Sequence, residues 1–96
     1  MNQTIDELTI RYQEGDREIV QELDKVVLSK GAWTTILFRY REWNRSKSAY
    51  GPEKYSIRRY QKRNGEYRQQ AKFNLSSRAQ AKALIEALQR WIAEES

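Results

Sequence analysis

The fold is decided by the stretch KYSIRRYQKR-NG-EYRQQAKFNL, residues 54–75, together with the run from Trp33 to Trp43 that precedes it. Asn64-Gly65 separates two runs with the alternation of strands, and both of its positions tolerate the positive φ angles of a two-residue hairpin turn. The pattern predicts that 54–63 and 66–75 are neighbouring antiparallel strands, with Trp33–Trp43 as a further strand.

Sequence parity divides the side chains of these three strands into two sets, because successive side chains on a strand point to opposite faces. The set predicted to face a core comprises Ile36, Phe38, Tyr55, Ile57, Ala71, Phe73 and Leu75. The set predicted to face water comprises Arg39, Arg41, Trp43, Arg58, Tyr60, Lys62, Arg68, Gln70 and Lys72. A wet sheet face lined with cations and flat rings suits a strand of nucleic acid better than a metabolite.

The rest of the chain is interpreted from turn and capping signals. Residues 17–28 read as a strand in which a bulge near 22–24 would restore the alternation, and Tyr67, like Tyr55, shares parity with the core set. The polar residues 44–53 are either a cationic finger extending the binding face or a loose connection. Ser77 and Gln80 form a capping-box start, after which apolar residues recur at helical spacing: Ala81, Leu84, Ile85, Leu88, Trp91 and Ile92.

We therefore expect an α+β protein, in which a curved antiparallel sheet of about four strands is followed by one C-terminal amphipathic helix packed on one face. Residues 17–96 would form the domain, and residues 1–16 an acidic N-terminal tail or edge strand. The apolar stripe of the helix is the natural cover for the apolar sheet face, and its far end also permits a dimer interface.

Composition argues against catalysis. The 96 residues include no cysteine and no histidine, which removes thiolate chemistry and the commonest general base and metal ligand. The four glycines are isolated turn residues, and Glu42, Glu53 and Glu66 are scattered over different elements. We expect no enzyme activity, cofactor, metal or small-molecule substrate. Without an apolar run of bilayer length or a signal peptide, we expect a cytoplasmic protein, nucleoid-associated if bacterial, with no membrane partner.

The net charge of +5 is unevenly distributed. Residues 1–24 hold seven acidic and two basic side chains, whereas residues 25–75 hold thirteen basic and three acidic ones. A one-signed patch of this kind is the electrostatic footprint of a polyanion partner. A further hypothesis is that the acidic N-terminal segment folds over its own basic face and competes with the ligand.

Three local motifs resemble the transcriptional positive cofactor four family of single-stranded-DNA-binding proteins, across roughly residues 17–94. Residues 54–60, KYSIRRY, resemble the family's Ile-Arg-x-aromatic strand, and residues 72–76, KFNLS, resemble its strand-to-helix junction. Residues 18–29 with Gly31-Ala32-Trp33 are similar to the first strand and turn of bacterial members. The family's junction glycine is replaced by Lys72, and its preceding lysines by Gln70 and Ala71, which weakens the phosphate contacts expected there.

The resemblance implies a four-stranded curved sheet with a kinked helix, assembled as a homodimer. It also implies binding of single-stranded or melted DNA across the sheet, with RNA left open, and a coactivator-like role in transcription or a role in replication or repair.

From parity and charge we assign phosphate contacts to six residues: Arg39, Arg41, Arg58, Lys62, Arg68 and Lys72. Tyr60 and Trp43 are the predicted stacking platforms, and Trp33 is a weaker candidate. Arg58 and Tyr60 are favoured, because parity, charge and the family motif agree on them. The alternative is a small interaction module that uses the same basic sheet against an acidic protein. Double-stranded RNA is less favoured, because its common binding domain begins with a helix.

Overall fold

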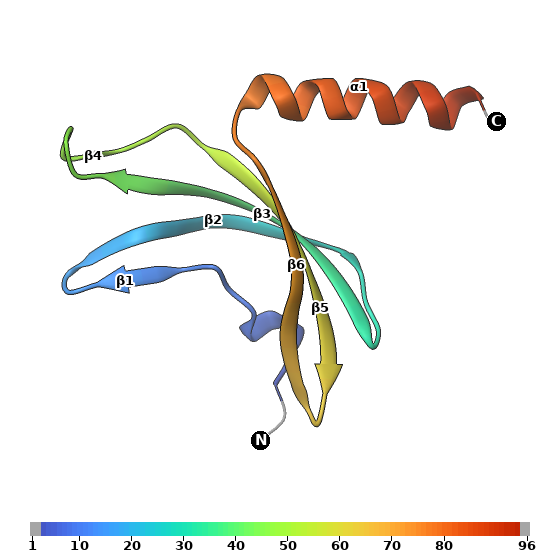
Figure 1. Ribbon diagram of the computed structural model, residues 1–96, viewed down its shortest axis with the longest axis horizontal. Helices are drawn as coiled ribbons and strands as arrows, with labels where there is room; N and C mark the ends of the chain where they lie inside the picture. Colours follow the sequence, from blue (N-terminus) through green and yellow to red (C-terminus); the bar gives the residue numbers. More distant parts are fainter. Residues whose placement is uncertain (1–2, 95–96) are drawn as a thin grey trace.

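The computed structural model describes residues 3–94, a strongly twisted antiparallel sheet followed by one helix (Figure 1). The strands pair in the order β1-β2-β3-β5-β6, and β4 pairs with β3. The elements in chain order are η1, a 3-10 helix (Ile5–Glu7), β1 (Tyr12–Glu14), β2 (Arg17–Ser29), β3 (Trp33–Asn44), β4 (Ala49–Tyr50), β5 (Lys54–Arg63), β6 (Glu66–Leu75) and α1 (Arg78–Glu94).

Local sequence signals locate most of these elements correctly. Strands β5 and β6 have the predicted bounds, and the turn between them has positive φ at both Asn64 (52°) and Gly65 (79°). The register of β2 against β3 shifts between Glu22 and Asp24, where the bulge was predicted. The sheet has six strands rather than about four, because β1 and the short β4 join it.

The pairing register shows that the predicted division into a core face and a wet face is wrong. Ile36 on β3 lies opposite Arg58 on β5, whereas Leu37 lies opposite Ile57. Directly opposed residues share a face, so each predicted set is split between the two faces. The reason is that parity holds within one strand, and the alignment of β5 against β3 depends on the connection between them.

We call the two sides the core face and the helix face. The core face of β3 and β5 carries Thr34, Ile36, Phe38, Tyr40, Ser56, Arg58 and Tyr60. The helix face carries Trp33, Leu37, Arg39, Tyr55, Ile57 and Arg59, and continues on β6 with Phe73 and Leu75.

The N-terminal residues complete the core. Leu8 and Ile10 are 5% and 8% exposed and pack with Phe38 and other side chains of the core face. The Lys25 ammonium donates hydrogen bonds to the backbone carbonyls of Ile5, Asp6 and Leu8 at 3.0, 3.0 and 2.8 Å. Residues 3–10 therefore pack into the folded unit, and β1, which follows them, lies at one edge of the sheet.

The same segment is tied to the β5–β6 hairpin. The Gln3 amide donates to the Gly65 carbonyl at 2.7 Å, and the Gln3 side-chain oxygen accepts from the Tyr67 amide at 2.9 Å. Asp6 and Glu7 of this segment are exposed, and neither carboxylate forms an ion pair with a described basic residue.

Helix α1 begins as the capping signal predicts, with the Gln80 amide donating to Ser77 Oγ at 3.1 Å. The Gln80 side-chain oxygen accepts from the Ser76 amide at 3.1 Å. Within a single copy of the chain, the prediction that the helix packs on a sheet face is wrong. Its substantial contacts within residues 3–94 are with the end of β6, and no described residue of it is buried.

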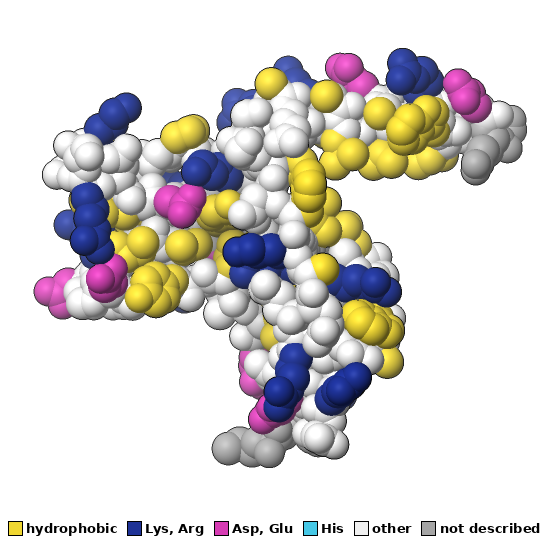
Figure 2. All heavy atoms as spheres, in the orientation of Figure 1, with side chains coloured by type: hydrophobic (Ala, Val, Ile, Leu, Met, Phe, Trp, Pro, Cys, Tyr) yellow, Lys and Arg dark blue, Asp and Glu magenta, His cyan; other side chains and the backbone are white. Residues whose placement is uncertain are grey.

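The helix instead overhangs the helix face (Figure 1). A groove of about 580 Å³ separates the two, lined by Leu28, Leu37, Ile57, Leu75, Leu84, Ile85 and Leu88 among others. In Figure 2 the underside of the helix is largely hydrophobic and faces a hollow. The radius of gyration is 15.7 Å, against about 12 Å for a compact domain of this length.

Candidate nucleic-acid interface

The β5–β6 hairpin is the most basic part of the sheet. It carries seven cationic side chains and one carboxylate, Glu66. The register distributes the cations over both faces: Lys54, Arg58, Lys62 and Lys72 lie on the core face, and Arg59, Arg63 and Arg68 on the helix face. Strand β6 is also the outer strand of the sheet, so both faces of the hairpin are reached from the same edge.

Arg58 and Lys72 are the central pair of this hairpin. They lie directly opposite each other on β5 and β6. Arg58 donates from Nε to Ser56 Oγ at 3.2 Å and from Nη1 to Gln69 Oε1 at 3.0 Å. Among the described residues, neither cation has a carboxylate within ion-pair distance. Like charges placed directly opposite destabilise a sheet, so the charges of this pair do not stabilise the pairing of β5 with β6.

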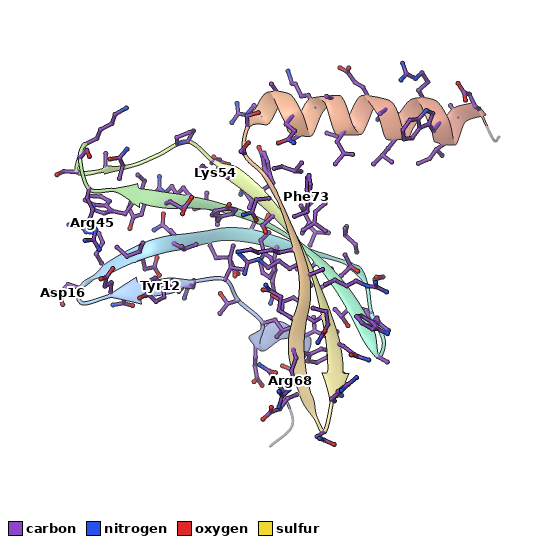
Figure 3. All side chains as sticks on the ribbon, viewed as in Figure 1. Tyr12, Asp16, Arg45, Lys54, Arg68 and Phe73 are labelled. Atoms are coloured by element: carbon purple, nitrogen blue, oxygen red, sulfur yellow. The ribbon has the colours of Figure 1, made fainter. Side chains whose placement is uncertain are left out.

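Two other residues predicted to contact phosphate form ion pairs with carboxylates. Arg39 lies 3.4 Å from Glu53 and 3.9 Å from Asp24, and it lines the groove beneath the helix. Arg68, labelled on β6 in Figure 3, lies 3.7 Å from Glu66 but keeps 69% of its side chain exposed. Arg39 is therefore largely neutralised, whereas Arg68 is accessible.

The remaining predicted cations contact rings. The Lys62 ammonium lies 5.5 Å from the Tyr67 ring centroid on the core face. On the helix face, the Arg41 guanidinium lies 4.5 Å from the Tyr50 ring centroid and donates to the Gln21 side chain. The predicted site residues thus do not form one surface, because the register places them on opposite sides of the sheet.

Tyr60 does not present a ring to solvent, contrary to its predicted stacking role. It is 6% exposed and belongs to the core cluster with Leu8 and Ile10. Desolvation by burial raises the pKa of its hydroxyl above the usual value, against a smaller lowering by Arg58. Sequence parity could not show this, because the covering side chains come from a segment about fifty residues away.

Trp43, the other predicted platform, is half-buried and contacts two neighbours. The Arg17 guanidinium lies 3.8 Å from its ring centroid, and the Tyr50 ring packs edge-on at 5.1 Å. The Tyr50 hydroxyl in turn donates to the Glu18 carbonyl at 2.9 Å. The predicted loop 44–53 contains the β3–β4 turn, strand β4 and the connection to β5, and Arg45, labelled in Figure 3, pairs with Glu14 at 2.8 Å. The segment is therefore tied to the sheet at β4, and a role as a cationic finger stays a prediction.

Trp33 differs from Trp43 in its setting. It begins β3, is 40% exposed, and has the Arg59 guanidinium 4.2 Å from its ring centroid. The register places Arg59 on the same face as Trp33, and alternation within a single strand could not show this contact.

Comparison with known proteins gives no match. No family model matches the chain, and no curated protein or solved structure is significantly similar to it. The resemblance of the local motifs therefore stays a prediction. Within residues 3–94, no helix is long and apolar enough to cross a membrane, and no group of acidic side chains could hold a metal ion.

Proposed function

We propose that this protein binds single-stranded nucleic acid, single-stranded or melted DNA first, through the β5–β6 hairpin and without catalysing a reaction. The observation that carries the proposal is the opposed pair of Arg58 and Lys72, two cations without a carboxylate partner in the described chain. A phosphate between them would remove the repulsion and supply charge-assisted hydrogen bonds.

The distribution of charge favours a polymer over a small anion. Cations continue along the hairpin from the central pair towards the turn, with Lys62 on the core face and Arg68 on the helix face. The pair is also open to solvent at the edge strand rather than enclosed in a pocket: Lys72 is exposed. A chain of phosphates can use several such cations at once, and a single phosphate cannot.

We propose a role in regulating transcription, or in DNA replication or repair, in the cytoplasm or nucleoid. This part of the proposal rests on the family resemblance of residues 54–60 and 72–76. The same resemblance suggests a homodimer.

The unburied apolar surface supports a homodimer independently. On α1, Ile85 and Trp91 are 52% and 58% exposed, and across the groove Leu28 and Phe73 are 54% and 58% exposed. In a two-fold symmetric dimer, the apolar helix side chains of each copy would cover the apolar sheet residues of the other. Such an interface needs self-complementary surfaces of this kind. In this proposal a second copy fills the groove.

Fluorescence anisotropy tests the binding function. A labelled oligo-dT of about 25 nucleotides, several bases per protomer, is titrated across a salt series beside a matched duplex. We expect preference for the single strand, with log K falling by about 0.7 per unit log salt for each phosphate neutralised. The double variant Arg58→Gln/Lys72→Gln should weaken binding and reduce that slope. Arg90→Gln removes one charge from the exposed helix and is the matched control.

Absence of oligonucleotide binding even at low salt would overturn the proposal. It would leave the alternative, an interaction module whose basic hairpin binds an acidic protein surface. Binding of such a protein would depend on the arginines of the hairpin, and no base stacking would contribute to it.

A further inference from the structure

The helix face carries an aromatic and cationic cluster outside the apolar groove. Trp33 on β3 lies opposite Gln61 on β5, and Gln61 lies opposite Arg68 on β6. These three residues form one row across the sheet, so their side chains share the helix face. Trp33 is not among the residues that line the groove beneath α1.

The Trp33 ring is held by a guanidinium and is still open. Arg59 lies 4.2 Å from the ring centroid, and Trp33 is 40% exposed. A guanidinium stacked on a ring keeps its N–H edge available for a phosphate. The ring area that Arg59 leaves uncovered is available to a flat ligand.

The surroundings are cationic. Arg63 is exposed on the same face, and Arg68 has 69% of its side chain exposed. One carboxylate, Glu66, lies among these three arginines, at 3.7 Å from Arg68. The other two tryptophans lack this combination, since Trp43 is half-buried between Arg17 and Tyr50 and Trp91 belongs to the apolar helix stripe.

We propose that Trp33 and Arg59 form a base-stacking site for single-stranded nucleic acid on the helix face. The base would stack on the open part of the Trp33 ring, and Arg59 would contact the adjoining phosphate. This inference rests on the proposed function and adds a second contact to it. Because Arg58 and Lys72 lie on the opposite face, one strand that reaches both sites must cross the outer edge of β6 or the Asn64-Gly65 turn.

The test separates bases from phosphates. Anisotropy titrations compare labelled oligo-dT with an abasic oligonucleotide of the same length, which keeps the phosphates and lacks the rings. Trp33→Ala should weaken binding of oligo-dT by roughly 5- to 150-fold, the range for loss of one stacked base, and should leave abasic binding and the salt slope nearly unchanged. Trp33→Phe should restore most of the affinity for oligo-dT.

A second readout reports the ring itself. In a Trp43→Phe/Trp91→Phe background, Trp33 is the only tryptophan, and oligo-dT should quench its fluorescence more strongly than the abasic strand does. The inference is overturned if oligo-dT binds without changing this fluorescence, or if Trp33→Ala weakens both ligands equally. A change in the oligomeric mass on Trp33→Ala would also overturn it, because Trp33 would then lie at a contact between copies of the chain. Failure of both oligonucleotides to bind the unaltered protein would instead reject the proposed function.

Discussion

Ile36 and Arg58 lie directly opposite each other on β3 and β5, so a fully buried core side chain and a cation share one face of the sheet. On the core face, the degree of burial therefore differs from strand to strand. Its β3 part is covered by the N-terminal segment, and its β6 part stays open around Lys72. The exposed basic residues of the β5–β6 hairpin lie beyond the part of the sheet that the N-terminal segment covers.

The opposed cations should cost stability. Lys72→Gln removes the repulsion with Arg58, so we expect the free energy of unfolding to rise by about 0.2–1 kcal/mol at low salt. The gain should shrink as salt is added, because screening already weakens the repulsion in the unaltered protein. Urea denaturation at two salt concentrations measures both effects. A loss of stability would show that Lys72 has a structural role.

The N-terminal segment should be indispensable to the fold. Leu8 is 5% exposed within the core, so Leu8→Ala should lower the free energy of unfolding by about 2–5 kcal/mol. Glu7→Gln, one residue earlier and exposed, is the matched control and should change it little. A Leu8→Ala protein as stable as the control would restore the prediction of a tail.

Substitution, not deletion, tests whether the acidic segment competes with the ligand. Asp6→Asn/Glu7→Gln removes two exposed charges and keeps the core side chains in place. Competition predicts tighter oligo-dT binding with an altered salt dependence. Unchanged affinity and salt slope in the anisotropy assay would rule competition out.

Burial of two tyrosines should make the fold sensitive to alkaline pH. Desolvation raises the pKa of both Tyr40 and Tyr60 above the ordinary tyrosine value of 10.0. The unfolded chain therefore loses these protons first, and the stability they contribute is present below about pH 10 and is lost as pH rises through the folded-state values. Tyr60→Phe should flatten the fall in thermal midpoint above pH 10. An identical alkaline profile would mean that Tyr60 stays accessible to solvent.

The apolar stripe of α1 should hold two copies together. Ile85→Glu places a charge on a side chain that is 52% exposed beside the groove, and we expect it to convert the proposed dimer to a monomer of 11.5 kDa. Light scattering after size exclusion measures the mass, with Glu86→Gln as control. A monomer before any substitution would reject the dimer.

Local chemistry accounts for what could be predicted from the sequence. Asn64-Gly65 specifies its own turn, and the broken alternation near 22–24 marks its own bulge. Relationships between distant segments could not be predicted this way. The alignment of β3 with β5 depends on the 44–53 connection, and the burial of Tyr60 depends on Leu8 and Ile10. The predicted site residues lie on both faces of the sheet for the same reason, and the roles of Arg58 and Lys72 stay a prediction.

The bonds that tie Gln3 to Gly65 and Tyr67 also determine when the protein can finish folding. A ribosome adds Tyr67 sixty-four residues after Gln3. Residues 3–10 therefore cannot make these bonds, and Leu8 and Ile10 cannot pack against Tyr60, until the β5–β6 hairpin has been synthesised. Contacts this distant in sequence form slowly, so the docking of residues 3–10 is expected to be a late step of folding.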